Sequence, residues 1–280
     1  MNSKIDAHMH VWKMARGDYD WLTPDLSGIY RDFGIDDAWG DAAKVGVSGV
    51  ILVQAAATAA ETDYMLSIAA NDNRVAGVVG WVDFEALSAS ENVARLAENP
   101  HIVGLRPMIA DLPDPAWILR QDLKPALEAM EAGGLVLDGH AHPDLVPVMS
   151  RLADHHPGLQ IVLNHGGKPP IESRQLDAWR EDIADLARRK NVACKISGLL
   201  TEAGAYTDDE SIGSIVCHLG ACFGPDRLLW GSDWPVLTLA SAYESWMAQS
   251  ERLFERYFPD HQDRIWSGNA ERIYLGHRGG

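Results

Sequence analysis

Short apolar runs alternate with segments of helical periodicity along the whole chain. Several runs, such as Val-Ile-Leu-Val at positions 50–53, are continuously apolar, which is typical of parallel strands buried on both faces. The pattern predicts eight strands, at Ile5–His8, Gly49–Gln54, Val75–Val82, Ile102–Pro107, Leu135–His140, Gln160–His165, Val192–Ser197 and Leu228–Asp233.

Segments with helical spacing lie between these strands. The segment Leu123–Ala132 has Pro125 near its first turn and ends at Gly133 and Gly134, which are the expected start and stop signals of a helix. The other predicted helices are Glu61–Asn73, Ser90–Glu98, Leu145–His155, Asp177–Arg189, Asp208–Phe223, Ser241–Phe258 and a short terminal helix at Ala270–Leu275.

A (β/α)8 TIM-type barrel contains eight strands that alternate with helices, which is the number predicted from this sequence. A doubly wound open sheet is the alternative. No linker divides the sequence, so we expect a single α/β barrel domain over residues 1–280. A long loop at Val11–Ile35 follows the first strand and is rich in aromatic residues. Such a loop is either a lid over a binding site or a segment that packs its own aromatic side chains.

The composition excludes several classes of partner. The 280 residues carry a net charge of −16 at pH 7, and this negative field repels nucleic acid and anionic membrane surfaces. Three cysteines without a paired motif indicate a reducing compartment rather than a disulfide framework. The first residues contain no signal-peptide pattern, and no apolar stretch is long enough to span a bilayer. We therefore expect a cytoplasmic protein without a membrane or nucleic-acid partner.

Polar side chains gather at the carboxyl ends of the predicted strands, where the active sites of barrels form. His8 and His10 are two residues apart, so they leave the same face of the first strand and can share a metal or a substrate. His165 ends the sixth strand. Asp233 ends the eighth, where a carboxylate can act as general base or metal ligand.

Further candidates follow the fourth, fifth and sixth strands. Arg106 requires an anion or carbonyl groups if it is buried, and the alternative to a substrate is a structural salt bridge with Asp83 or Asp138. Lys168 follows two glycines and can point over the mouth of the barrel. Either His140 or His142 can reach the same mouth, since the two residues share a face.

The phrases around these residues resemble the amidohydrolase superfamily, and more closely its sugar-lactonase branch. They run in order across nearly the whole chain: Ile5-Asp6-Ala7-His8, Asp18-Tyr19-Asp20-Trp21-Leu22-Thr23-Pro24, Gly80-Trp81-Val82-Asp83, Gly104-Leu105-Arg106-Pro107, His165-Gly166-Gly167-Lys168-Pro169, Cys194-Lys195-Ile196-Ser197-Gly198 and Gly231-Ser232-Asp233-Trp234-Pro235. The sequence departs from the family at Asn164, where an aspartate is usual, and it lacks the bridging lysine of two-metal members.

The resemblance implies that Asp233, His165, His8 and His10 form the catalytic set of a lactonase. It implies either one divalent metal, with zinc as the first candidate, or metal-free catalysis. In the metal-dependent form, His8, His10 and Asp233 would be the ligands, with His140 or His142 as a candidate for a further one. Two alternatives stay open, namely a zinc-dependent decarboxylase that acts on an aromatic or muconate-type acid, and a sugar-binding barrel without activity.

The substrate expected from the resemblance is the lactone of a sugar acid. A dicarboxylate would require several cations at the mouth, and the sequence places there Arg106, Lys168 and Lys195 at most. A neutral lactone therefore fits better, with Trp21 and Trp234 stacked on its ring and His142 among the binding residues. We expect L-rhamnono-1,4-lactone first and L-fuconolactone second.

Overall fold

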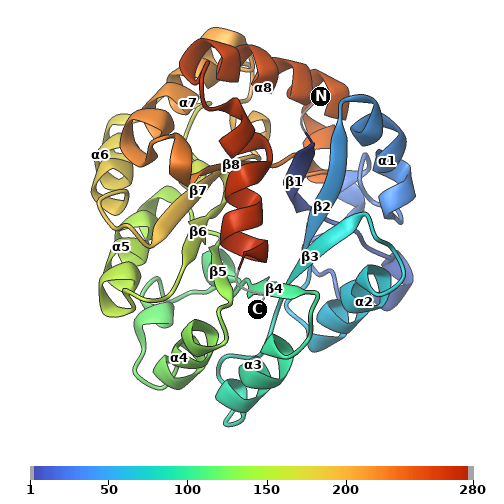
Figure 1. The fold of residues 1–280 in the computed structure, drawn as a ribbon, viewed down its shortest axis with the longest axis vertical. Helices are drawn as coiled ribbons and strands as arrows, with labels where there is room; N and C mark the ends of the chain where they lie inside the picture. The colour runs from blue at the N-terminus through green and yellow to red at the C-terminus, as the bar shows by residue number, and fades with distance from the viewer. Residues whose placement is uncertain (1–2, 277–280) are drawn as a thin grey trace.

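The computed structural model describes residues 3–276. Its eight strands form one sheet in which each strand pairs in parallel with the next along the chain. Figure 1 shows the strands arranged around a central axis with the helices outside them, so the predicted (β/α)8 barrel is confirmed. The strands are β1 Lys4–Met9, β2 Val47–Val53, β3 Val75–Gly80, β4 Ile102–Leu105, β5 Val136–Gly139, β6 Ile161–Leu163, β7 Val192–Ile196 and β8 Leu228–Trp230.

The barrel closes where β1 meets the segment that follows β8. The backbone N–H of Asp233 donates to the carbonyl oxygen of His8 at 2.8 Å, and the N–H of His10 donates to the carbonyl oxygen of Trp234, also at 2.8 Å. We call this pair of hydrogen bonds the seam. The seam joins the first strand to the segment after the last strand, and it brings His8, His10 and Asp233 to one place.

Eight helices surround the barrel within residues 3–276, and their apolar faces pack on the outer face of the sheet. Thr58 caps α2, because its hydroxyl oxygen accepts the N–H of Glu61 at 3.1 Å. The helices are α1 Ile35–Lys44, α2 Ala59–Ala69, α3 Ala89–Ala97, α4 Lys124–Ala132, α5 Val146–His155, α6 Asp177–Leu186, α7 Asp209–Phe223 and α8 Tyr243–Tyr257.

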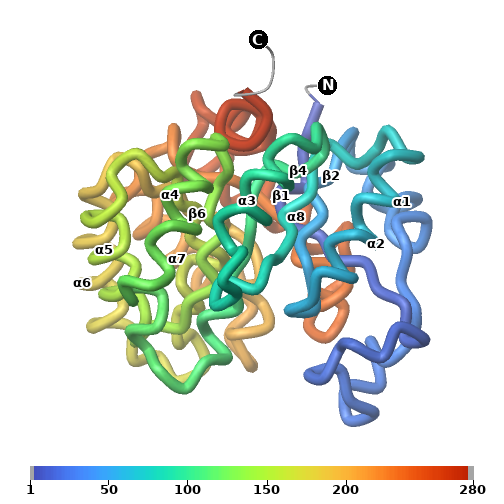
Figure 2. The backbone as a smooth tube through the Cα atoms, turned by 90° about the horizontal axis from the view of Figure 1, so that it is seen from below, coloured from blue at the N-terminus to red at the C-terminus, as the bar shows by residue number. Residues whose placement is uncertain are grey.

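The C-terminal segment closes one end of the barrel. Two π-helical turns, Arg264–Gly268 and Glu271–Leu275, lie across this end, beside the N-terminus of β1 (Figure 2). Ala270, Ile273 and Tyr274 of this segment pack against the inward side chains of the strands, and we call these three residues the barrel floor. The polar ends of the strands therefore meet at the opposite end.

Sequence reasoning missed α1 and made most of the strands too long. Two of the three buried residues of α1 are alanines, so its apolar stripe is weak in the sequence, although Asp36 and Asp37 in its first turn and Lys44 in its last turn favour a helix. The predicted strand ends at Gln160–His165 and Leu228–Asp233 extend into loops, because polar residues that line a pocket need not continue a ladder. Helix α3 begins at Ala89, one residue before the predicted start at Ser90.

The loop after β1 packs its own aromatic side chains and also contributes to a pocket, so both roles considered for it are present. Trp12 and Tyr19 are buried, and the Tyr19 hydroxyl donates to Glu61 at 2.7 Å, so the loop packs its own aromatic residues against α2. Trp21 in the same loop lines the pocket described below. Among residues 3–276, no helix is both long and apolar enough to cross a membrane.

Candidate active site

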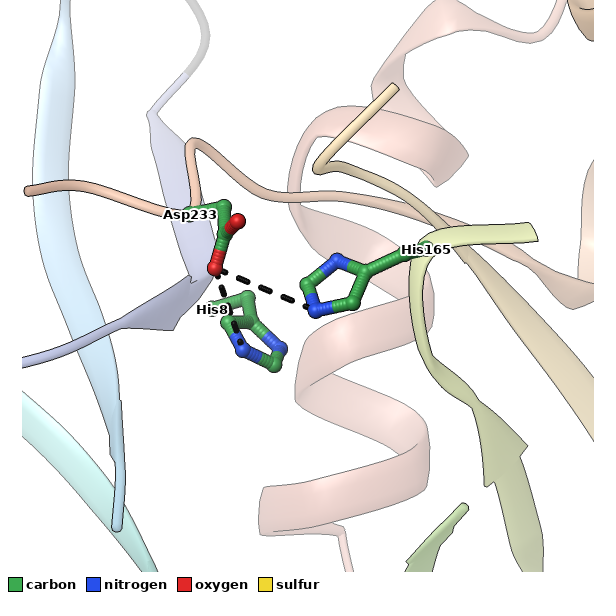
Figure 3. A group of neighbouring side chains, drawn as sticks. All are labelled: His8, His165 and Asp233. Carbon is green, nitrogen blue, oxygen red and sulfur yellow. Dashed lines mark ion pairs between the residues drawn. The ribbon is translucent and has the colours of Figure 1, made fainter. Parts of the chain in front are cut away.

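Four side chains meet inside the barrel end opposite the floor. His8 lies in β1 and His10 directly follows it, and strand alternation brings their Nε2 atoms to 3.2 Å from each other. His165 follows β6 and Asp233 follows β8 (Figure 3). We call these four residues the His–Asp cluster.

Asp233 stands at the centre of this cluster. Its Oδ1 atom lies 3.3 Å from His10 Nε2, 3.6 Å from His8 Nε2 and 3.8 Å from His165 Nε2. Its φ of 62° is in the left-handed region, a strained conformation for aspartate that the seam holds in place. Burial alone would raise the pKa of Asp233, but the polar and charged groups around the carboxylate outweigh burial and lower that pKa. The carboxylate is therefore ionised at neutral pH.

Neutral histidines surround this carboxylate. Burial lowers the pKa of His165 to about 3, and it also lowers the pKa of His10 and, further still, that of His8. His165 Nδ1 lies 2.9 Å from the Ser197 hydroxyl. His10 Nδ1 lies 2.7 Å from the carbonyl oxygen of Val53, which can only accept, so this nitrogen carries the proton.

The cluster consequently contains two acceptors that face each other. Because His10 Nδ1 holds the proton, His10 Nε2 presents a lone pair to the ionised Asp233 Oδ1 at 3.3 Å. A cation or an N–H group that faces both atoms is required to offset this contact.

A divalent cation fits the arrangement. Ligand atoms of His8, His165 and Asp233 lie within 4.8 Å of one another, and His10 Nε2 adjoins them. Imidazole nitrogens together with one carboxylate oxygen are the donor set of zinc sites, and the Val53 carbonyl behind His10 is a typical outer partner of a ligand histidine.

The cluster forms one side of a pocket of about 310 Å³. The lining combines cationic and imidazole groups from the loops after β4, β5 and β6 with apolar side chains such as Trp21 and Met108. Lys168 is paired with Glu202 at 2.5 Å, so its charge is largely neutralised. The lining residues are His10, Trp21, Ala55, Arg106, Met108, Asp111, His140, His142, His165, Lys168, Gly198, Thr201, Asp233 and Val236.

Arg106 lies at the inner wall of this pocket and is 4% exposed. Its Nη2 donates to the main-chain carbonyl of Gln54, and the Gln54 amide donates to the Arg106 carbonyl at 2.9 Å. Its Nε atom is buried without a partner among the described residues. The structural alternative, a salt bridge with Asp83 or Asp138, is wrong for residues 3–276, since Asp138 pairs with Lys195 instead.

Two expectations are corrected by the structure. Trp234 is 5% exposed and packs edge-on against Phe33, with ring centroids 5.1 Å apart, so it lies outside the pocket lining and cannot stack on a substrate ring. Lys195 lies fully buried in β7 rather than at the mouth. Trp21, with 39% of its surface exposed, remains as the aromatic wall.

Two other features were missed in the sequence. Gly198 has a φ of +59°, and a Cβ atom there would lie 2.5 Å from His165 Nδ1, so the site needs glycine. Tyr274 of the barrel floor donates its hydroxyl hydrogen to Asp138. A charged Lys195 inside an apolar strand was a readable signal that a buried acid must face it.

Comparisons with known proteins agree with this geometry. A family model described as amidohydrolase matches residues 5–275. An L-fucono-1,5-lactonase from Burkholderia ambifaria is 41% identical over 278 residues, which are 98% of this chain and 96% of that protein. An L-fucono-1,5-lactonase from Burkholderia multivorans is 31% identical and covers 97% of this chain and 95% of its own.

Solved structures extend the comparison. A crystal structure of an amidohydrolase from Burkholderia multivorans with bound zinc superimposes with a TM-score of 0.91 at 31% identity, over 97% of this chain and 98% of that one. A 5-carboxyvanillate decarboxylase from Sphingomonas paucimobilis, at 19% identity with a TM-score of 0.66, covers 98% of this chain and 99% of its own and shares the fold.

Proposed function

This chain belongs to the amidohydrolase family, and on that premise we propose that it is a lactonase that hydrolyses L-fucono-1,5-lactone to the open-chain acid. The hydrolysis of a sugar lactone agrees with both named relatives. The observation that carries the proposal is the ionised Asp233 carboxylate among three neutral imidazoles beside the pocket.

Ester hydrolysis needs an activated water, a place for negative charge on the carbonyl oxygen and a proton for the leaving alkoxide. We assign the first task to Asp233, which would accept a proton from water and return it to the ring oxygen. Arg106, whose guanidinium group belongs to a residue of the pocket lining, would stabilise the oxyanion, and the imidazoles of His10 and His165 would orient the carbonyl group.

The pocket favours a neutral polyhydroxylated ring. Lys168 is neutralised by Glu202, Lys195 lies outside the pocket and Asp111 adds a negative charge, so a dicarboxylate would find little compensation. His140 and His142 would exchange hydrogen bonds with ring hydroxyls, and Trp21 would cover the apolar face. The sequence favoured L-rhamnono-1,4-lactone, but the names of the two relatives support placing L-fucono-1,5-lactone before it.

We propose that the cluster also accepts one divalent cation, with zinc first because a related structure contains it. His8, His10 and Asp233 are the ligands expected from the sequence, and His165 lies equally near. A bound zinc would supply Lewis acidity to the carbonyl group or to water. Asp233 would keep its task of proton transfer, and Arg106 and the pocket histidines would keep their tasks of binding and orienting the lactone.

A pH-indicator assay of the purified protein against a panel of aldonolactones tests the function. We expect acid release from L-fucono-1,5-lactone at a higher kcat/KM than from L-rhamnono-1,4-lactone. Parallel assays after chelation and after added Zn²⁺ measure metal dependence. Acid release from none of the lactones would contradict the proposal, and CO2 release from an aromatic acid would replace it with the decarboxylase alternative.

A further inference from the structure

A buried ion pair lies beneath the His–Asp cluster, inside the barrel. Lys195 of β7 and Asp138 of β5 are both fully buried, with Nζ 2.6 Å from Oδ2. Asp138 also accepts the Tyr274 hydroxyl on Oδ1 and the Asn164 amide on Oδ2, the latter at 3.1 Å. Neither partner of the pair lines the pocket. The proposed reaction therefore leaves this pair without a task.

Lys195 makes a second contact that reaches the cluster. Its Nζ atom lies 3.3 Å from His8 Nδ1. An ammonium group carries donors and no acceptor, so Nδ1 of His8 must accept. A neutral imidazole carries one proton, which in His8 then resides on Nε2.

The contacts of His10 lead to the same position for the His8 proton. The Val53 carbonyl can only accept, so His10 donates from Nδ1 and accepts at Nε2. His8 Nε2 lies 3.2 Å from His10 Nε2 and 3.6 Å from Asp233 Oδ1. An N–H at His8 Nε2 consequently faces both of the acceptors that otherwise oppose each other.

We propose that Lys195, held in place by Asp138 and Tyr274, is a positioning residue that fixes His8 as the Nε2–H tautomer. His8 then acts as a hydrogen-bond donor to His10, and the same Nε2–H faces Asp233 Oδ1, with Nε2 at 3.6 Å from that oxygen. The barrel floor takes part in this arrangement, because Tyr274 is the group from the C-terminal segment that binds Asp138. The kinetic arm of the test rests on the proposed function, and the spectroscopic arm does not.

Nuclear magnetic resonance on ¹⁵N-histidine-labelled protein without substrate tests the tautomer. Two-bond ¹H–¹⁵N correlations show which ring nitrogen carries the proton, and the His8→Gln spectrum identifies the signal of His8. We expect the proton on Nε2 in the wild type. The double variant Lys195→Met/Asp138→Asn removes the donor without leaving a buried unpaired charge, and we expect His8 to lose its preference for this tautomer. A wild-type proton on Nδ1, or an unchanged His8 in the double variant, would overturn the proposal.

Tyr274→Phe is the gentler variant, since it keeps the ring and removes the hydroxyl. We expect kcat to fall about 10-fold with KM within about twofold, and the His8 signal to move in the same direction as in the double variant. Tyr243→Phe is the matched control, because the Tyr243 hydroxyl donates to the buried Asp6 at 2.9 Å, and Asp6 binds the backbone N–H of His8 rather than its ring. An equal shift of the His8 signal in both variants would contradict the route through Lys195.

Different results would contradict the proposed lactonase function and the proposed positioning role of Lys195. If the wild type releases acid from none of the lactones, the proposed function fails while the spectra still decide the tautomer. If the tautomer is wrong and lactone turnover is intact, the positioning role fails alone.

Discussion

Asp233 carries the largest share of the proposed chemistry, because its Oδ1 atom lies within 3.3–3.8 Å of three imidazole nitrogens and its charge is preserved despite burial. Sequence reasoning placed Asp233, His8, His10 and His165 correctly at strand ends, since parity and the barrel rule together locate such residues. The proton positions could not be predicted, because they depend on partners such as Val53 that lie elsewhere in the chain.

Replacing Asp233 with asparagine keeps the shape of the side chain and removes its basicity. We expect lactone turnover to fall by at least about 100-fold, with an unchanged circular dichroism spectrum and melting temperature. Asp83→Asn, at an exposed carboxylate outside the pocket, serves as the control for the assay. Near-wild-type turnover in Asp233→Asn would exclude the general-base role.

His165 predicts how stability depends on pH. Burial lowers its pKa to about 3 against the pull of Asp233, with Lys168, Arg106 and His10 acting in the same direction as burial. In the unfolded chain its pKa is about 6.5, so the unfolded state takes up a proton that the folded state refuses as pH falls below that value. The free energy of unfolding should therefore fall between pH 6.5 and 3, by up to about 1.4 kcal/mol per pH unit from this residue.

Denaturant titrations of the wild type and of His165→Gln between pH 7 and 4.5 measure this contribution. Asp6, whose pKa is raised by burial to about 6, acts in the opposite direction between about pH 4 and 6, so the difference between the two proteins is the quantity to compare. We expect the wild type to lose stability more steeply. Parallel curves would show that His165 titrates normally.

At the scale of the elements, the loops that follow the strands carry the residues of the site. In the loop after β7, a glycine leaves room for two of these residues. Gly198 follows β7, and a Cβ atom there would lie 2.5 Å from His165 Nδ1 and 3.2 Å from Asp233 Oδ2. We therefore expect Gly198→Ala to displace His165 and to lower kcat by about 100-fold.

Gly204→Ala is the matched control for that variant. Gly204 has a similar φ of +53°, but a Cβ atom there would meet the exposed side chain of Glu172 rather than the cluster. Both variants should lose about 1–2 kcal/mol of stability from backbone strain, and Gly204→Ala should keep its kcat. Equal kinetic losses in the two variants would assign the effect to strain rather than to the collision with His165.

The order of elements was more predictable than their ends. Continuous apolar runs located all eight strands, since burial on both faces leaves a clear signal. The predicted ends of β6 and β8 lie too far along the chain, because polar site residues such as His165 and Asp233 follow those strands within a few positions and read as part of them. Helix α1 was missed because two of the three residues of its buried stripe are alanines, Ala38 and Ala42, which give a weak hydrophobic signal in the sequence.

At the scale of the whole molecule, the barrel floor makes two separate contributions. One is to the stability of the inner core, and the other is to the buried network beneath the His–Asp cluster. Ile273 fills the inner core and Tyr274 binds Asp138. We expect Ile273→Ala to lower the free energy of unfolding by about 2–5 kcal/mol while kcat stays within about twofold. Chemical denaturation and lactone kinetics measured side by side with Tyr274→Phe check this contrast. A loss of kcat without a loss of stability in Ile273→Ala would contradict it.

Long-range contacts limited the prediction at this scale. Lys195, Asp138 and Tyr274 come from β7, β5 and the C-terminal segment, and no local pattern in the sequence connects them. The fold rule assigns residues to strand ends, but it says nothing of what closes the barrel from below. The buried network was therefore visible only once the strands were placed around a common axis.

The seam has a consequence for biosynthesis. Ser232 and Asp6 lie 226 positions apart in the chain and are joined across the seam by a hydrogen bond, and Asp233 reaches His8 through the next one. A ribosome-bound chain that ends before β8 holds the histidines without their carboxylate, so the proposed role of Asp233 predicts that it is inactive. During refolding, lactone turnover should then return only when the barrel closes at the seam, and not when the individual strands and helices form. The rate at which activity returns should therefore equal the rate of complete folding.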